Sequence, residues 1–138
     1  MNKTQTTVGA FANPAAYGFE YQTFGAWGAY GNATTPAYAV SVGNSSPASA
    51  IPAVGSLTFT GGSTGYYVDA SKFGYVTNAA MVAVITFDNR TLAFTTTNTS
   101  IAGGPGAPQI SAPSLNMTGT LNYAAGTNAM TGTASTTN

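Results

Sequence analysis

The side chains that could perform chemistry in this chain are few. Among its 138 residues there are three bases and three acids, and there is neither cysteine nor histidine. These absences exclude disulfides, thiolate catalysis, imidazole acid–base chemistry and the usual Cys/His zinc sites. The ionisable residues are Lys3, Lys72, Arg90, Glu20, Asp69 and Asp88.

An enzymatic role would have to be built from this small set. A pair of catalytic carboxylates would need two of the three acids, and Asp88 is better explained by Asp88-Asn89-Arg90, which is typical of a tight polar turn. A serine triad lacks its histidine, and a calcium loop needs several closely spaced acids. We therefore expect that the chain is not an enzyme and has no metal site. Six Asn-x-Ser/Thr matches indicate polar surface and begin at Asn2, Asn32, Asn44, Asn89, Asn98 and Asn116.

Aromatic residues leave a ligand-binding role open. A tyrosine phenolate or a methionine sulfur can ligate haem iron, and Tyr66 and Tyr67 are the most suggestive candidates. Neighbouring residues of a strand point to opposite faces, so we expect one of the two tyrosines to be exposed. Trp27 and Tyr30, from an aromatic-rich segment, are further candidates for a ligand surface. The alternative for all four is packing in the core and across strands, which we favour. No cofactor is therefore expected, although haem stays open.

The charge balance limits the partners. Charged residues make up 4% of the chain, against about 25% in ordinary globular domains. Positive and negative charges cancel, so no electrostatic field attracts nucleic acid or an acidic membrane. A neutral polar surface also lacks the repulsion that keeps copies apart, which makes self-association plausible. No apolar run approaches the roughly 18 residues of a membrane helix, so we expect a chain that does not span the membrane.

The first residues, Met1-Asn-Lys-Thr-Gln-Thr, lack the apolar centre of a signal peptide. Either the protein is not exported by that route, or this is a mature or partial chain with a replacement Met1. We favour the second reading, because the composition resembles that of extracellular proteins. The expected location is the cell exterior or the outer-membrane surface, with the signal or anchor outside this sequence.

Alternation of apolar and polar residues predicts strands along most of the chain. Residues 79–87 read as a central strand, residues 91–97 return from a turn at Asp88-Asn89-Arg90, and residues 114–123 alternate most regularly. Gly55 to Val68 reads as a hairpin that turns or bulges at Gly61-Gly62. Other predicted strands are 17–30, 37–42 and 129–134, while 43–52, 69–78 and 101–113 read as connections. No segment has helical periodicity.

About eight antiparallel strands at short spacing indicate an all-β fold, a barrel or a sandwich. We expect a single up-and-down β-barrel domain over residues 17–138. Residues 1–16 would precede it as a lead-in or a short edge strand.

Several strand segments occur in a family-like order. These are Tyr21-Gln-Thr-Phe-Gly-Ala-Trp-Gly28, the stretch from Gly55 to Val68, Ser114-Leu-Asn-Met-Thr-Gly-Thr-Leu-Asn-Tyr123 and Met130-Thr-Gly-Thr133. From about Phe19 onward the chain resembles the C-terminal β-barrel domain of transferrin-binding-protein-B-like surface lipoproteins and related secreted haem-binding proteins of Gram-negative bacteria. The resemblance implies an eight-stranded antiparallel barrel that serves as a non-enzymatic scaffold binding a host protein or haem.

Two departures from that family carry expectations of their own. The chain lacks the lipidated cysteine of the family, and it stops at Thr137-Asn138, where family members continue into a Gly-x-Phe-Tyr-Gly-Pro-type segment. The barrel is then expected to be incompletely closed at its C-terminal end, and open edges recruit strands. Two functions follow: a surface or secreted binding module that uses loops around Asn44, Lys72 and Gly104, or a self-assembling subunit of a filament or surface layer. The second would receive a strand donated by residues 1–14. A third reading is a fragment of a larger protein.

Overall fold

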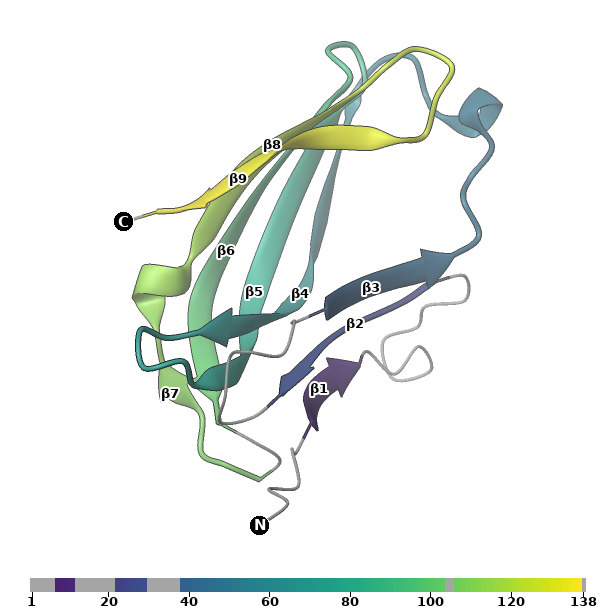
Figure 1. Cartoon of the computed structure of the whole chain (residues 1–138). Helices are drawn as coiled ribbons and strands as arrows, with labels where there is room; N and C mark the ends of the chain where they lie inside the picture. Colours follow the sequence, from purple (N-terminus) through teal and green to yellow (C-terminus); the bar gives the residue numbers. More distant parts are fainter. Residues whose placement is uncertain (1–6, 12–21, 30–37, 104–105, 138) are drawn as a thin grey trace. The chain divides into compact units, whose positions relative to one another are not determined.

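The structure, a computed structural model, describes residues 7–11, 22–29, 38–103 and 106–137. This part of the chain is built from strands, with two single-turn 3₁₀ helices, η1 (Ala48–Ala50) and η2 (Pro113–Leu115). Figure 1 shows the strands, which are β1 (Thr7–Phe11), β2 (Gln22–Ala29), β3 (Tyr38–Gly43), β4 (Ser56–Val68), β5 (Gly74–Thr86), β6 (Thr91–Ala102), β7 (Ile110–Ser111), β8 (Met117–Tyr123) and β9 (Met130–Thr136).

The strands form two sheets. One has the order β1-β2-β3, and the other has the order β4-β5-β6-β8-β9, with the short β7 paired to β6. The pairs β1–β2, β2–β3, β6–β7, β6–β8 and β8–β9 are antiparallel. The expected all-β antiparallel fold is therefore confirmed. No closed barrel is found within the described residues, so the barrel itself is not established.

The strand β8, which has the most regular alternation in the sequence, pairs with β6 on one side and with β9 on the other. Leu121 lies opposite Leu92 of β6 and opposite Gly132 of β9, so these positions share one face of the sheet. Phe94 lies opposite Gly119, and Tyr123 lies opposite Met130. The same face continues on β5 through the buried Ala83 and Ile85, and the buried Phe87 follows in the turn after β5. Threonine and asparagine occupy the alternate positions of β8, as the sequence pattern predicts.

Several predicted boundaries were wrong. Gly55 to Val68 is not a hairpin, because β4 runs without interruption through Gly61 and Gly62. Neither glycine has a positive φ angle, so both adopt extended backbone as readily as they could have formed a turn. The polar connection predicted for 69–78 is shorter, because β5 begins at Gly74. Its turn is closed by Asp69, whose Oδ1 accepts a hydrogen bond from the Phe73 N–H at 2.8 Å.

Two further boundaries differ from the prediction. The loop predicted for 101–113 contains β7 and the end of β6, because β6 runs five residues beyond position 97 and continues through Asn98, which has a positive φ of 54°. Residues 114–116 are not strand, because Pro113 begins η2 there. The predicted turn at Asp88-Asn89-Arg90 is confirmed: the Arg90 N–H donates to the Phe87 carbonyl at 3.1 Å.

The chain divides into two compact units, and each has its own buried residues. Unit 1 comprises residues 1–44, 64–78 and 100–111, and unit 2 comprises residues 45–63, 79–99 and 112–138. Ala26, Val76 and Ala102 are buried in unit 1, and Ala83, Ile85 and Phe87 in unit 2. Three of the five boundaries between the units fall inside β4, β5 and β6. The expected division into a lead-in of 1–16 and a domain of 17–138 stays a prediction.

Unit 2 also buries two threonines, and both have hydrogen-bond partners. Thr99 Oγ1 donates to the side-chain carbonyl of Asn116 at 2.8 Å, and the Thr99 N–H reaches the same oxygen at 3.1 Å. The Met117 N–H donates to Thr96 Oγ1 at 2.7 Å. A buried polar group without a partner would cost about 1–3 kcal/mol, so these bonds hold η2 and the start of β8 against β6.

Candidate functional site

The candidate ligand residue Tyr66 packs against backbone in unit 1. Its ring occupies the space where a β-carbon on Gly28 would lie, with Cε1 and Cε2 only 2.6 and 2.8 Å from that position. The glycine in β2 is therefore what allows the tyrosine of β4 to approach. Burial raises the pKa of the Tyr66 phenol, because the low-dielectric surroundings disfavour its anion. Tyr66 is thus held in its neutral form.

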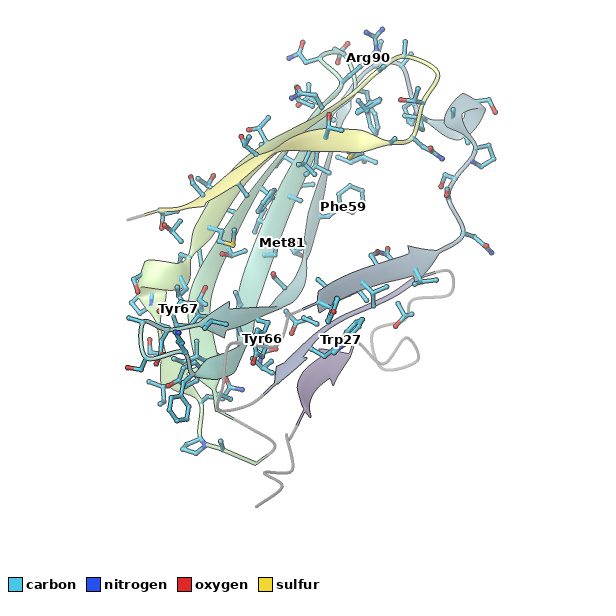
Figure 2. The ribbon with its side chains drawn as sticks, in the orientation of Figure 1. Trp27, Phe59, Tyr66, Tyr67, Met81 and Arg90 are labelled. Carbon is cyan, nitrogen blue, oxygen red and sulfur yellow. The ribbon has the colours of Figure 1, made fainter. Side chains whose placement is uncertain are left out.

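Tyr67 faces a different set of groups (Figure 2). Its ring stacks on that of Tyr75, with centroids 6.2 Å apart and an interplanar angle of 28°. The Tyr75 hydroxyl in turn donates to Asp69 Oδ2 at 3.2 Å. Both Tyr66 and Tyr67 are half-buried, so the expectation that one of them is exposed was wrong. Each face of β4 has a covering group at this point: the Gly28 backbone for one tyrosine and the Tyr75 ring for the other.

Trp27 lies on β2, next to Gly28. Its ring stacks on Tyr38 of β3, with centroids 5.4 Å apart and an interplanar angle of 23°. Trp27 and Tyr38 are paired across β2 and β3, so this contact is a cross-strand pair of the kind that stabilises sheets. The fourth candidate, Tyr30, lies outside the described residues, as does Gly104. The observed contacts are those of packing, which is the alternative that the sequence favoured.

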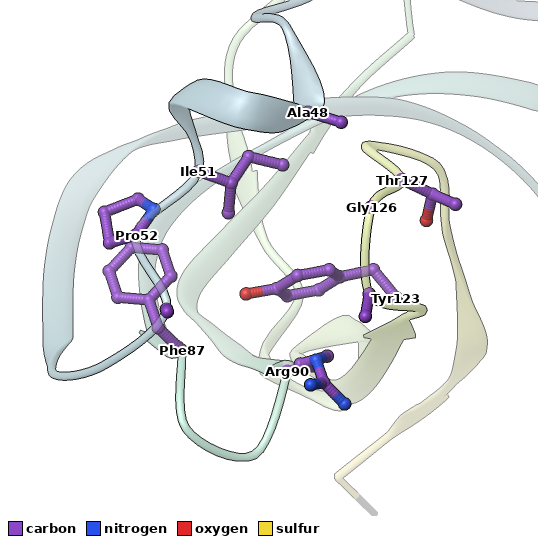
Figure 3. Close-up of a pocket in the computed structure, with 10 residues that line it drawn as sticks. Ala48, Ile51, Pro52, Phe87, Arg90, Tyr123, Gly126 and Thr127 are labelled. Carbon is purple, nitrogen blue, oxygen red and sulfur yellow. The ribbon is translucent and has the colours of Figure 1, made fainter.

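A hollow in unit 2 brings together residues that the sequence did not single out as a site (Figure 3). Its volume is about 150 Å³, and it is lined by residues from the segment before β4, the β5–β6 turn, the end of β8 and the β8–β9 turn. Ile51, Pro52 and Phe87 supply apolar walls, and Arg90 and Tyr123 supply polar groups. The Tyr123 hydroxyl is buried and has no hydrogen-bond partner among the described residues.

Hydrogen bonds between the three segments hold the walls of this hollow in place. Asn128 Nδ2 donates to the Ser46 carbonyl at 2.9 Å, and the Gly55 N–H donates to Asp88 Oδ2 at 2.9 Å. The Tyr123 N–H donates to the Arg90 carbonyl at 3.1 Å. The segment at 45–55, the β5–β6 turn and the β8–β9 turn are thus joined pairwise. Asp88 was expected to serve its turn, and its bond to Gly55 adds a contact across 33 residues.

The sequence contains a partial signal for this hollow. Tyr123 ends the apolar face of β8, where a hydroxyl is the one polar atom in a series of apolar side chains. The remaining walls come from residues 48–53, which the sequence indicates as a loop, and from the β5–β6 and β8–β9 turns. These parts meet only through long-range contacts, so no local pattern could have predicted them.

The described residues were compared with the requirements of a metal site and of a membrane-spanning helix. In the described part of the chain, no group of three or more histidine, cysteine, aspartate or glutamate side chains could hold a metal ion. The described residues also include no helix with the length and apolar character needed to cross a membrane.

Comparison with protein-family models, with curated proteins and with solved structures found no match for this chain.

Proposed function

We propose that this chain is a non-enzymatic binding module, displayed at a cell surface or secreted, that binds a protein through one face of its larger sheet. The observation that carries the proposal is an exposed group of apolar side chains in unit 2, here called the apolar margin: Leu57, Phe59, Met117 and Met130. Their exposed fractions are 51, 54, 38 and 39%. Exposed apolar side chains on one face of a sheet are a feature of protein interaction surfaces.

Strand register supports a common face for the apolar margin. Met130 is paired with Tyr123, and Met117 alternates with Leu121 on β8. Just before β4, the Gly55 carbonyl accepts a hydrogen bond from the Phe87 N–H at 2.8 Å, which places Leu57 opposite Ile85 in antiparallel register. The margin therefore continues the face that buries Ile85, and its members flank the centre of the sheet on β4 and on β8–β9 (Figure 1).

The family resemblance supports the same function and adds two expectations. It implies that the sheet belongs to an eight-stranded antiparallel barrel and that the partner is a host protein or haem. The Tyr66 ring packs against the Gly28 backbone, which favours the protein partner over iron ligation by its phenol.

The proposal is tested by immobilising the chain and measuring the binding of transferrin, the host protein that the resemblance names. Binding should be weakened by Phe59→Ser and left unchanged by Thr58→Ser, which alters the alternate face of the same exposed strand. If transferrin binds equally to both variants, the apolar margin is not the binding surface. If it does not bind at all, a transferrin-binding function is refuted for this chain.

A second function, self-assembly, is favoured by the edge at β9. In the described sheet β9 pairs only with β8, and all seven of its residues are exposed. It contains no charge, proline or bulge that would block another strand, and such edges recruit strands. The lead-in of residues 1–14 is less suited to donating a strand, because its strand β1 is already paired with β2. A strand donated by residues 1–14 would first have to leave that pair.

Light scattering coupled to size exclusion separates the two functions. Assembly through the edge predicts a mass that rises with concentration, and Thr133→Lys on β9 should abolish that rise. Thr95→Lys adds the same charge at an exposed position of the interior strand β6 and should leave it unchanged. Deleting residues 1–14 tests donation by the lead-in. A constant monomer mass in all four proteins would refute assembly.

A further inference from the structure

We infer that the hollow around Tyr123 is a binding site for a small amphipathic anion: a molecule about the size of one aromatic ring, with a hydrogen-bonding group at its inner end and a negative charge at its outer end. This site shares no lining residue with the apolar margin, although Tyr123 is paired with Met130 of the margin, and it does not depend on the protein-binding function. Each part of the ligand corresponds to a feature of the lining residues in Figure 3.

The size of the ligand follows from the volume. The hollow measures about 150 Å³. A cavity of about 150 Å³ with apolar walls accommodates a benzene molecule. The side chains of Ile51, Pro52 and Phe87 provide such walls, and Phe87 is 7% exposed. Pockets for small molecules generally combine apolar walls of this kind with a few polar groups that orient the ligand.

The inner polar group follows from Tyr123. Its hydroxyl is buried and has no partner among the described residues, although a buried polar group normally has one. The hydroxyl can both donate and accept a hydrogen bond, so it matches a hydroxyl or carbonyl group of a ligand. The Tyr123 N–H donates to the Arg90 carbonyl at 3.1 Å, which holds the backbones of the two residues together.

The outer charge follows from Arg90. It is exposed, lines the same hollow, and carries the only charge among the lining residues, which include no acid. The nearest acid in sequence, Asp88, has its Oδ2 engaged by the Gly55 N–H. A guanidinium donates in a planar fork that suits a carboxylate. A ligand that enters ring-first would therefore leave a carboxylate beside Arg90.

The test uses three probes: 4-hydroxybenzoate, which has both polar ends, benzoate, which lacks the inner hydroxyl, and phenol, which lacks the charge. Two-dimensional NMR titration gives affinities and the residues affected. 4-Hydroxybenzoate should shift resonances of 48–53, 87–90 and 123–127 in a saturable manner, with the millimolar affinity usual for a ligand of this size. Benzoate and phenol should each bind more weakly.

Two variants separate the contacts. Tyr123→Phe keeps the ring and should weaken 4-hydroxybenzoate binding about 5- to 10-fold, the value of one hydrogen bond, without changing benzoate binding. Arg90→Gln should weaken both acids about 2- to 5-fold, as expected for an exposed charge pair, without changing phenol binding. Arg90→Lys should retain most of the acid affinity. Tyr67→Phe and Lys72→Gln, which lie in unit 1, are the matched controls.

Several results would overturn the inference. Shifts spread over the whole chain, or no saturation by 4-hydroxybenzoate, would show that no site exists. Equal affinities for 4-hydroxybenzoate and phenol would exclude recognition of the anion. Loss of acid binding in Lys72→Gln as large as that in Arg90→Gln would assign the effect to net charge. Because Arg90 has a φ of 53°, the spectrum of each Arg90 variant also shows whether the turn is preserved. If Arg90→Gln unfolds the turn, the inference rests on Arg90→Lys and Tyr123→Phe, and unchanged binding in Tyr123→Phe refutes it.

Discussion

The contact between Gly119 of β8 and Phe94 of β6 makes a quantitative prediction. The two residues lie directly opposite each other, and the Phe94 ring covers the glycine backbone. A β-carbon placed on Gly119 would lie 2.5 and 2.6 Å from Cε1 and Cζ of Phe94, and 2.8 Å from the Thr133 carbonyl oxygen of β9. Gly119→Ala must therefore displace a ring on one side and a backbone strand on the other.

The magnitude follows from these two obstacles. Overpacking of a well-packed site costs about 1–3 kcal/mol. Replacing glycine also reduces the freedom of the unfolded chain, which returns about 0.4–1 kcal/mol. We expect a net loss of about 1–2 kcal/mol in the free energy of unfolding. At roughly 3 °C per kcal/mol for a domain of this length, the midpoint of thermal unfolding should fall by roughly 3–6 °C.

Urea and thermal unfolding followed by far-ultraviolet circular dichroism measure this loss. Gly61→Ala is the matched control, because a β-carbon there meets nothing within 4 Å and should be neutral or slightly stabilising. In a Phe94→Leu background the cost of Gly119→Ala should become smaller, since part of the ring is gone. The part of the destabilisation that comes from the close approach of the new β-carbon to the Thr133 carbonyl should remain. If Gly119→Ala is as stable as Gly61→Ala, the close contact between β6 and β8 is not as described.

Three further predictions concern Tyr66 and Asp88. Because burial raises the pKa of Tyr66, the folded chain keeps the phenol proton to higher pH than the unfolded chain, so the free energy of unfolding should fall as the pH rises above about 10. In urea titrations Tyr66→Phe should lose part of this fall, and an unchanged pH dependence would contradict the burial of the phenol. When haem is added at neutral pH, the absorption spectrum should show no tyrosinate–haem band, because the Tyr66 phenol is neutral. A tyrosinate–haem band that is present in the original chain and absent in Tyr66→Phe would instead identify Tyr66 as an iron ligand. Asp88→Ala should lower the free energy of unfolding by about 0.5–1.5 kcal/mol, because the hydrogen bond to the Gly55 N–H is lost. Asn89→Ala in the same turn should cost less. Equal losses in the two variants would show that the destabilisation comes from the turn and not from the bond to Gly55.

The strand pattern of the sequence predicts most of the larger sheet. Leu121, Phe94 and Ile85 lie on the face that alternation assigns to them, because a strand has a side-chain period of two and one face is buried. Gly61 and Gly62 misled the prediction for β4, since glycine is equally compatible with a turn and with extended backbone. The exposure of Leu57 was also not predictable, because it depends on what covers the strand rather than on the strand itself.

The candidate sites also include features that follow from local sequence pattern and features that depend on long-range contacts. The packing interpretation of Trp27, Tyr66 and Tyr67 needed only local rules about aromatic rings on strands. The hollow around Tyr123 depends on bonds such as Asn128 to Ser46, which joins residues 82 positions apart. A search for motifs in the sequence examines neighbours along the chain, so it could find Tyr123 and Arg90 but not their common cavity.

The course of β4, β5 and β6 has a consequence for dissecting the protein. Each of these strands belongs to unit 2 for part of its length and to unit 1 for the rest, with changes near Ser63, Asn78 and Thr99. No single cut in the chain can therefore release either unit as a continuous polypeptide. A truncation intended to isolate one unit would leave three severed strands with unpaired backbone. Complementation by two fragments would instead require a break at a turn, such as Asp88–Arg90, which leaves every strand whole.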